Sequence, residues 1–439
     1  MSQSHHRLPA RIPVLLILAL LAALPVGQPA RADDWPQWRG PNRDARSAES
    51  GLLGSWPEGG PKKLWSASGF GVGYSSLAVA GGRIYTLGDL DAGQYLIAAR
   101  QSDGGVLWKT KVGPALAHDF PGPRSTPTVA GNRACALGTE GDLVCVRSDD
   151  GKEIWRRNIL TDFAGRQMKY GGQHYWRISE SPLVDEGRVI VTPGAADALL
   201  VALDADTGKE VWRTKGAGSL GEKGDDGTAY SSAIVSNAGG VRQYVQLVGR
   251  GAVGVEAATG RLLWSYNRIA NRTANIPTPI VKNDLVFVST AYETGAALLK
   301  LAPGGGGITA TERYFLPHDV FQNHHGNMIL EDGVIYAGHG HNRGYPIAVE
   351  MQTGKVLWGP ARNDGTGSAA VAWADGRMYM RYQNGLMVLV ETTPEAYRQR
   401  GSFMIPDVRR ESWSHPVIAD GVLLLREQDR IHAYALKSP

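Results

Sequence analysis

Four histidines in one stretch of the chain have the chemistry to bind a metal ion. His324 and His325 are adjacent, and His339 and His341 are one residue apart in a predicted loop that ends at Arg343. Imidazole is a common zinc ligand, so two or three of these rings could converge on one ion. The fixed spacing of a zinc motif such as H-E-x-x-H is absent. The alternative is that the rings hydrogen-bond between crossing loops or line a polar funnel.

The histidines are unevenly distributed along the chain. Eight of the nine that follow residue 32 lie in long predicted loops, and only His432 lies in a predicted strand. The short turns at 80–83, 130–132 and 185–187 contain none. Part of this bias is trivial, because loops are polar in any protein. We still expect the long loops to share one face of the fold, and that face is the candidate functional one.

The same loops carry other side chains that suit ligand binding. Aromatic faces stack on flat or apolar groups, arginine pairs with anions, and carboxylate and amide oxygens coordinate hard cations. No Gly-x-Ser-x-Gly elbow accompanies a triad, and we assign no catalytic residue. The candidate ligand-binding residues are Arg124, His174, Trp176, Glu180, Tyr230, Asn275, His324, His325, His339, His341, Arg343 and Trp413.

An eleven-residue phrase recurs between these loops and predicts the elements that position them. Its clearest copy spans residues 202–212, with a small residue first, glycine seventh and tryptophan last. Each copy ends a unit of four short predicted strands, and a period of roughly forty to fifty residues is typical of a radial β-repeat. The tryptophans that we expect to dock on a neighbouring unit are Trp65, Trp108, Trp155, Trp212, Trp264 and Trp358.

The last repeat unit is incomplete, and the other end of the chain can complete it. Three predicted strands follow residue 415, whereas residues 62–65 have the end of the phrase without its beginning. A strand borrowed from the N-terminal side would close the ring and remove its open sheet edges. We therefore predict an all-β, eight-bladed β-propeller with four-stranded blades over residues 62–439. An extended strap, residues 33–61, precedes it.

Residues 1–32 are typical of a cleavable signal peptide. Arg7 and Arg11 precede an apolar run at 12–24, and Ala-Arg-Ala at 30–32 is a small-x-small cleavage site. The run is short for a membrane span, although an uncleaved anchor is the alternative. No cysteine follows it that could carry a lipid. We expect a periplasmic or secreted protein with no membrane span after cleavage.

The net charge of the chain bears on which classes of molecule it could bind. The chain has a formal net charge of +4, and the signal peptide removes three arginines and no acidic residue. A near-neutral mature surface gives no electrostatic reason to bind nucleic acid or an anionic membrane. We expect a monomer with a protein, small-molecule or glycan ligand.

The chain has two cysteines, Cys135 and Cys145, on adjacent predicted strands. If they lie directly opposite, their separation suits a disulfide, but a one-residue slip would place them on different faces. Cys145 also occupies the small first position of the phrase, so a buried free thiol is the alternative. Both alternatives stay open.

The phrase at residues 202–212 resembles the tryptophan-docking repeat of quinoprotein propellers, and the resemblance covers residues 62–436. The strap motif Trp-Pro-Gln-Trp-Arg-Gly-Pro at 35–41 and the segment 338–344 are similar to secreted bacterial PQQ-like propellers, many of unknown function. The resemblance to quinoprotein dehydrogenases implies pyrroloquinoline quinone (PQQ) and calcium on the channel axis. It also implies a vicinal cysteine pair, which this chain lacks.

Four residues could take over the roles of a quinoprotein site, although no motif aligns them. Glu180 and Asn275 could imitate calcium ligands, Arg124 a quinone-binding arginine and Asp225 a base. The chain also resembles the BamB-type assembly propeller, a non-catalytic eight-bladed scaffold held at a membrane by a lipid. Its size and blade count suit this chain, whereas the missing lipid-bearing cysteine does not.

The sequence favours a non-catalytic binding or scaffold protein that acts through its loop-rich face and uses no cofactor. One alternative is a quinoprotein-type oxidoreductase that uses PQQ and Ca²⁺. Another is a carbohydrate-binding or hydrolytic protein with Trp176, Trp413 and Tyr230 as stacking platforms. Whether the chain is an enzyme stays open, because a fold does not fix a function.

Overall fold

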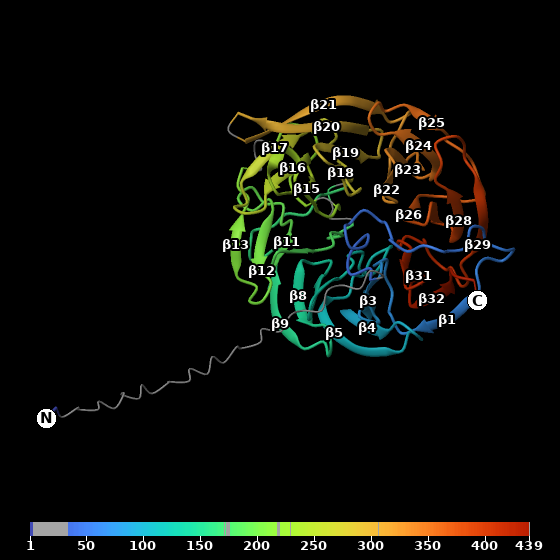
Figure 1. Ribbon diagram of the computed structural model, residues 1–439, viewed down its shortest axis with the longest axis horizontal. Helices are drawn as coiled ribbons and strands as arrows, with labels where there is room; N and C mark the ends of the chain where they lie inside the picture. Colours follow the sequence, from blue (N-terminus) through green and yellow to red (C-terminus); the bar gives the residue numbers. More distant parts are fainter. Residues whose placement is uncertain are drawn as a thin grey trace.

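The computed structural model describes residues 1–2, 34–170, 172, 176–216, 220–228, 230–305 and 307–438. Within them, 32 strands form eight four-stranded sheets arranged around a central axis (Figure 1). The predicted eight-bladed, all-β propeller is therefore confirmed. We number the blades in chain order and letter the strands of each blade A to D from the axis outward.

Blades 1 to 4 follow one another without exchange of strands, and a 3-10 turn, η2 (Ala238–Gly240), joins the first two strands of blade 4. Their strands are β2 (Ala78–Ala80), β3 (Arg83–Leu90), β4 (Gly93–Arg100), β5 (Val106–Pro114), β6 (Thr128–Ala130), β7 (Arg133–Leu137), β8 (Asp142–Arg147), β9 (Glu153–Asn158), β10 (Leu183–Asp185), β11 (Arg188–Val191), β12 (Val201–Asp204), β13 (Glu210–Arg213), β14 (Ile234–Ser236), β15 (Gln243–Val248), β16 (Gly251–Glu256) and β17 (Leu262–Tyr266).

Blades 5 to 7 repeat this pattern, and blade 8 takes its D strand from the N-terminal side. Their strands are β18 (Ile280–Lys282), β19 (Leu285–Thr290), β20 (Gly295–Gly304), β21 (Gly307–Pro317), β22 (Met328–Glu331), β23 (Val334–His339), β24 (Tyr345–Glu350), β25 (Val356–Trp358), β26 (Ala369–Ala374), β27 (Arg377–Tyr382), β28 (Leu386–Glu391), β29 (Gln399–Met404), β30 (Val417–Ala419), β31 (Val422–Glu427), β32 (Arg430–Ala435) and β1 (Lys63–Ser68).

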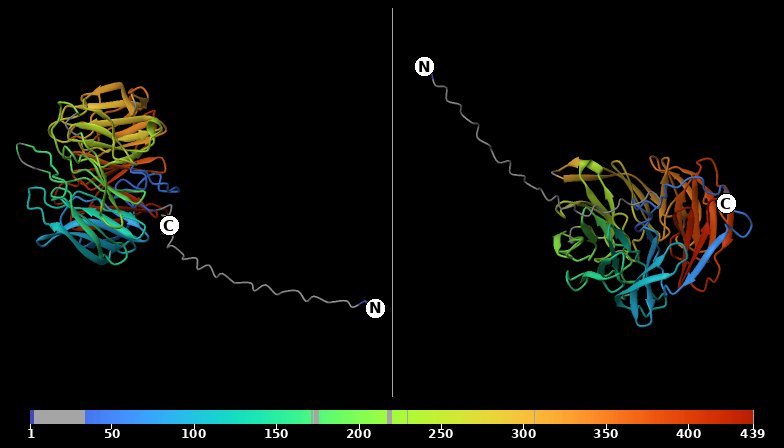
Figure 2. Two further views of the ribbon diagram at one scale, coloured as in Figure 1. Left: turned by 90° about the vertical axis from the view of Figure 1, so that its left-hand side faces the viewer. Right: turned by 60° about the horizontal axis from the view of Figure 1, so that its bottom comes forward.

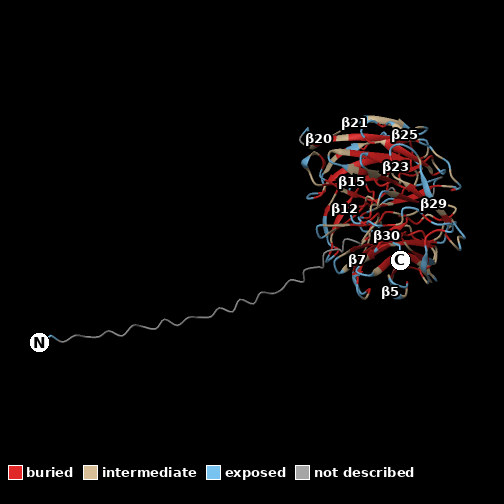
Figure 3. Ribbon diagram, turned by 45° about the vertical axis from the view of Figure 1, so that its right-hand side comes forward, coloured by how far each residue is buried: buried red, intermediate tan, exposed pale blue. Residues whose placement is uncertain are grey.

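Burial follows the order of strands within a blade (Figure 3). The B and C strands pack against neighbouring blades on both faces, so β15 is buried at every position. The D strands expose one face, and β1 alternates between exposed and half-buried residues. These two patterns explain why the inner strands read as apolar runs and the outer strands as alternating sequences.

The tryptophan that ends the phrase docks on the next blade. Trp155 lies opposite Cys145 in its own blade, which is why the first position of the phrase is small. Its indole N–H donates to the carbonyl of Ala205 in blade 3 at 2.9 Å. Its ring covers Gly208, where an added Cβ would lie 2.7 Å from the ring. Gly208 also has φ +67°, so both the turn and the docked ring require glycine here.

The other blades repeat or modify this contact. The indole N–H of Trp358 donates to the carbonyl of Thr393, whereas that of Trp264 donates to Gln243 of its own blade. In blade 5, Tyr314 replaces tryptophan and covers Gly354. The same contact recurs as Trp65 on Gly104, Trp108 on Gly151 and Trp212 on Gly260.

Blade 8 is closed by β1, as predicted. β1 pairs antiparallel with β32, with Ser66 opposite His432. The Ser66 hydroxyl and His432 Nδ1 are 2.8 Å apart. Arg426 on β31 ties blade 8 to blade 1, because its guanidinium donates to the Thr86 hydroxyl on β3 at 2.7 Å. It also donates to the carbonyls of Phe70 and Gly71, in the segment between β1 and β2, at 3.1 and 3.0 Å. Burial lowers the pKa of Arg426 to about 9.

The described part of the strap, residues 34–61, crosses the axis on the face that carries the A–B turns. In the side views it lies at the same face of the ring as the C-terminus (Figure 2). Backbone or side-chain hydrogen bonds join it to every blade, so it plugs this end of the channel. Its partners in blades 1 to 8 are Val79, Val129, Ser181, Ala233, Thr278, Met328, Trp373 and Gly421.

Arg43 is the centre of the strap. Its guanidinium donates to the carbonyls of Ala233 at 2.7 Å, Ser181 at 3.0 Å and Pro182 at 2.7 Å. The side chain is buried, which lowers its pKa to about 9 even though the carboxylate of Glu180 acts in the opposite direction. Arg43 thus supplies the donors that the inward-facing carbonyls of blades 3 and 4 need in a region closed to water.

Cys135 and Cys145 lie opposite each other on β7 and β8 and form a disulfide, which decides between the two alternatives. Residues 3–32 of the predicted signal peptide lie outside the described residues, and that prediction stays untested. No helix among the described residues is long and apolar enough to cross a membrane.

Trp65→Ala tests the closure of the ring. We expect the free energy of unfolding to fall by about 2 kcal/mol in urea denaturation. This is less than the roughly 3–5 kcal/mol of a fully buried site, because the ring is partly exposed. The matched control is Leu64→Ala, which removes an exposed side chain of the same strand and should change stability by less than about 0.5 kcal/mol. Equal stability of the two variants would contradict the docking role of Trp65.

Arg43→Ala tests the plug. It leaves three inward-facing carbonyls without their donor, and we expect a loss of about 3 kcal/mol of stability. Limited proteolysis should cut the strap of the variant faster than that of the wild type. Glu58→Ala, at an exposed strap position, serves as the control. An unchanged cleavage rate in Arg43→Ala would mean that the strap is held by other contacts.

Candidate functional site

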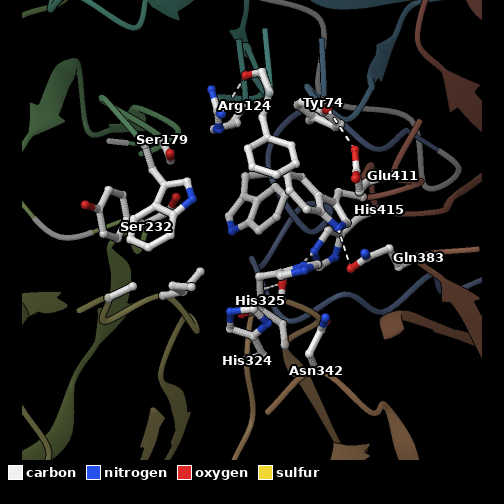
Figure 4. Close-up of a pocket in the computed structure, with 18 of the residues that line it drawn as sticks. Tyr74, Arg124, Ser179, Ser232, His324, His325, Asn342, Gln383, Glu411 and His415 are labelled. Atoms are coloured by element: carbon white, nitrogen blue, oxygen red, sulfur yellow. Dashed lines mark hydrogen bonds between the residues drawn. The ribbon is translucent and has the colours of Figure 1, made fainter. Parts of the chain in front are cut away.

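A cavity of about 310 Å³ lies among the loops of the face opposite the strap (Figure 4). These are D-to-A and B-to-C loops, which emerge on the face that the sequence predicted to be functional. With one exception, Trp38 of the strap, every lining residue belongs to them. The lining residues are Trp38, Tyr74, Phe120, Arg124, Trp176, Ser179, Tyr230, Ser232, Ala274, Ile276, Tyr292, His324, His325, Asn327, Asn342, Gln383, Glu411, Trp413 and His415.

Aromatic rings form two walls of this cavity. On one side, the ring of Trp413 lies 4.7 Å from that of Tyr74 and 5.0 Å from that of Phe120, both tilted by about 40°. On the other side, Trp176 and Tyr230 meet edge to face at 5.8 Å. Tilted and edge-to-face packing is the favoured geometry of aromatic pairs, so each wall is a rigid unit.

The strap forms the floor of the cavity. The indole N–H of Trp38 donates to the Thr278 hydroxyl at 3.0 Å, and its ring lies 4.5 Å from the His415 ring. His415 Nε2 lies 3.1 Å from the carbonyl oxygen of His325, and neutral His415 donates its N–H there. A residue far from the loops in sequence therefore closes the cavity toward the channel.

Several polar groups of the cavity have unused hydrogen-bonding capacity. The Tyr230 hydroxyl and His325 Nε2 are buried, and neither has a partner among the described residues. Gln383 accepts the indole N–H of Trp413 through Oε1 at 3.0 Å. Asn342 accepts from Ser368 through Oδ1. Within the described part of the chain, the NH₂ groups of both amides have no hydrogen-bond acceptor. Such groups are the usual anchors of a ligand.

Arg124 places a positive charge at the edge of the cavity (Figure 4). Its guanidinium donates to the carbonyls of Gly122 at 2.9 Å and Phe120 at 2.8 Å and lies 5.6 Å from the Tyr74 ring. Burial lowers its pKa to about 10, which leaves it charged at neutral pH. It forms no ion pair with any described residue. The cavity therefore contains a half-buried guanidinium that no described carboxylate pairs with, although the carboxylate of Glu411 also lines the cavity.

The histidines of the cavity are neutral at pH 7. Burial, then the neighbouring His325 and His341, lowers the pKa of His324. Burial, then His341, lowers that of His325 to about 4. Both nitrogens of His324 have partners, because Nδ1 lies 2.7 Å from the Ser368 hydroxyl and Nε2 lies 3.0 Å from the Tyr292 hydroxyl.

The metal hypothesis gains no support from this arrangement. The rings of His324 and His341 lie 4.6 Å apart, but His339 is separate and accepts the backbone N–H of Gln322 through Nδ1 at 3.3 Å. His339 also ends strand β23 and does not lie in the loop where we predicted it. Among the described residues, no group of three or more His, Cys, Asp or Glu is placed to hold a metal ion.

Glu180 and Asn275, the residues that could imitate calcium ligands, do not line the cavity. Glu180 is buried and accepts from the hydroxyl and backbone N–H of Thr192, each at 2.8 Å. Burial raises its pKa to about 7. Asn275 is buried and donates to the carbonyls of Val248 and Gly249 at 3.2 and 3.1 Å. Both side chains are used within the protein, and the residues present therefore do not fit a calcium–PQQ site at the cavity.

The structure separates the other predicted site residues into two groups. The ring of His341 is tilted against that of Tyr292 at 4.3 Å without lining the cavity, and Arg343 is exposed outside it. His174 lies outside the described residues. The predicted residues that the structure brings together at the cavity are Arg124, Trp176, Tyr230, His324, His325 and Trp413. That they bind a ligand stays a prediction.

Sequence reasoning missed several residues of the cavity. Tyr74 and Tyr292 lie in loops that it passed over, yet each is an aromatic residue between two predicted strands, which was a usable signal. Trp38 belongs to the strap motif at 35–41, and no local pattern places it under loops more than 200 residues away. Gln383 and Glu411 gave no signal of their own.

Comparisons with known proteins agree on the fold. The family model described as outer membrane protein assembly factor BamB matches residues 92–360. BamB of Burkholderia pseudomallei (strain K96243) is 25% identical over 329 residues, which are 73% of this chain and 74% of that protein.

Two solved structures resemble this protein in fold at low sequence identity. The quinohemoprotein alcohol dehydrogenase ADHIIG of Pseudomonas putida HK5 superposes with a TM-score of 0.59 at 14% identity, over 93% of this chain and 81% of that one. BamB of Moraxella catarrhalis gives 0.51 at 13% identity, over 80% and 94%. Identities this low show a shared fold and nothing about activity. The family model, which covers more than half of the chain, decides the membership: this protein belongs to the family of the outer membrane protein assembly factor BamB.

Proposed function

We propose that the protein is a non-catalytic binding propeller that holds a small ligand, or a short part of a partner protein, in the aromatic cavity of its loop-rich face. One observation carries this proposal. The cavity combines rigid aromatic walls with a buried hydroxyl and an imidazole nitrogen that have no partner among the described residues, and with a guanidinium that uses only part of its donors within the protein. Unused polar groups in an apolar concave site are what a bound ligand satisfies.

The arrangement of side chains supports binding more than catalysis. The carboxylate of Glu180 and both nitrogens of His324 are engaged in hydrogen bonds within the protein. A general base needs a lone pair in reach of the substrate, and neither of these two groups offers one there. His325 Nε2 and the Glu411 carboxylate do line the cavity, and we assign them to ligand binding. The relative from Burkholderia pseudomallei is named for outer membrane protein assembly, which supports a partner protein as one source of the ligand.

We further propose a periplasmic or secreted location, a cleaved signal peptide and a monomer. The disulfide between Cys135 and Cys145 supports an oxidising compartment, because such bridges persist outside the cytosol. The fold is also compatible with the alternative, a PQQ- and Ca²⁺-dependent dehydrogenase. Glu180 and Asn275 argue against it, because both are buried and hydrogen-bonded within the protein. Sequencing the N-terminus of the exported protein tests the cleavage.

Tyr230→Phe tests the binding proposal. The Tyr230 hydroxyl has no partner among the described residues, so its removal should leave stability unchanged or slightly raised. A thermal-shift screen of small molecules, peptides and glycans should yield ligands that stabilise the wild type. Ligands that bond this hydroxyl should lose affinity in the variant by roughly five- to ten-fold, as expected for one hydrogen bond of about 1 kcal/mol or slightly more.

The screen includes an arm for the alternative. PQQ with Ca²⁺, an alcohol panel and a dye acceptor should give no dye reduction. Dye reduction would replace our proposal with the dehydrogenase. If no compound stabilises the wild type, or if the ligands bind Trp413→Ala as tightly as the wild type, the cavity is not a binding site.

The buried histidines predict a pH dependence of stability. The pKa of His325 is about 4 in the folded protein, below its ordinary value of 6.5, so the unfolded chain takes up the proton first. Its contribution to stability is complete above pH 6.5 and falls by up to about 3 kcal/mol as the pH drops to 4. Urea unfolding of the wild type and His325→Gln at pH 7.5 and 4.5 measures this, because the comparison cancels the opposite contribution of Glu180. Equal pH dependence in both proteins would contradict the assignment.

A further inference from the structure

We infer that the ligand of the cavity is a short saccharide that presents an anionic sugar, a pyranose ring bearing a carboxylate or a sulfate ester. The inference rests on the proposed binding function and names its ligand class. It follows from three features that meet in the same cavity: aromatic walls, planar polar side chains at the rim and an arginine without a carboxylate partner. Each feature matches one part of such a sugar.

The aromatic walls match the apolar face of the ring. A pyranose has C–H groups on its faces and hydroxyl groups around its edge. The walls built on Trp413 and Trp176 are rigid and stand on different sides of a cavity of about 310 Å³, whose floor is the indole of Trp38. Indole and phenol rings pack against such flat, partly apolar surfaces at a low cost in conformational entropy.

The polar side chains match the hydroxyl groups. Gln383 and Asn342 each use their carbonyl oxygen within the protein, which leaves an NH₂ group as donor. The Tyr230 hydroxyl can donate or accept, and His325 Nε2 can do either according to its tautomer. In Figure 4 the labelled polar residues are distributed around the aromatic centre and not gathered at one point. A ligand with polar groups along its whole edge satisfies this arrangement, whereas a purely apolar ring would leave the buried groups unpaired.

Arg124 matches the anionic group. Its guanidinium is half-buried and donates two N–H groups to backbone carbonyls of its own loop. Its remaining N–H groups form no ion pair with a described carboxylate, although Asp89 acts on the charge without pairing with it and Glu411 lines the same cavity. A buried charge is stable when it is paired, and a planar guanidinium binds carboxylate and sulfate oxygens through two parallel hydrogen bonds. A neutral sugar would leave the guanidinium without an ion-pair partner.

Calorimetric titration of the purified protein with matched galactose-type oligosaccharides tests the inference. The probes are a galacturonic acid trimer, a sulfated galactose trimer and neutral galactotriose. We expect at least one anionic trimer to bind at least about ten-fold more tightly than galactotriose, with the two anionic arms separating carboxylate from sulfate. Arg124→Gln should abolish this preference. Arg343→Gln removes an exposed arginine of the same face that lies outside the cavity, and should retain the preference.

The outcomes distinguish the inference from the function on which it rests. Galactotriose binding as tightly as both anionic trimers would overturn the anionic class. If no saccharide binds while the thermal-shift screen yields other ligands of the cavity, the inference fails and the binding function stands. If nothing binds, both fail. Should Arg124→Gln not fold by circular dichroism, Gln383→Ala replaces it. That variant should weaken any bound trimer at least about five-fold, and unchanged binding would place the sugar elsewhere.

Discussion

The structure depends on the supply of hydrogen-bond donors to backbone carbonyls that face the axis of the ring. The inner strands of the eight blades surround this axis, and residues just before two of them, Ser181 and Pro182 before β10 and Ala233 before β14, present carbonyl oxygens to the strap. Side chains of the strap supply these donors, and Arg43 alone donates to the carbonyls of Ser181, Pro182 and Ala233. Because buried polar groups must be paired, the strap is a structural part of the propeller and not a mere leader to β1.

Closure of the ring and docking between blades also depend on a small number of specific contacts. Four of the outer tryptophans, Trp65, Trp108, Trp155 and Trp212, cover the glycine of the next blade's turn, so these neighbouring blades are joined one pair at a time. Blade 8 has in addition the β1–β32 pairing that closes it, and the guanidinium of Arg426 joins it to blade 1. The rigid loop ends that result explain how side chains from all eight blades can line one small cavity.

The fold was predictable because its signals are local. A glycine at a left-handed turn and a tryptophan four residues later are demands of one blade and its neighbour, and they recur in the sequence. The site was less predictable because the use of a polar side chain is decided at long range. Glu180 and Asn275 are side chains that can coordinate a metal ion. In the folded protein they instead hydrogen-bond to buried partners such as Thr192 and Val248. Trp38 reaches the cavity only because the strap crosses the axis.

Trp38 also couples ligand binding on one face of the ring to the seating of the strap on the other face. Its indole is both the floor of the cavity and a part of the segment that is seated on the opposite face. A molecule that touches this ring binds the seated form more tightly than a form with the strap withdrawn. Reciprocity then requires that occupancy of the cavity hold the strap in place by the same free energy. Events on one face of the propeller are thereby felt on the other without any movement of the blades.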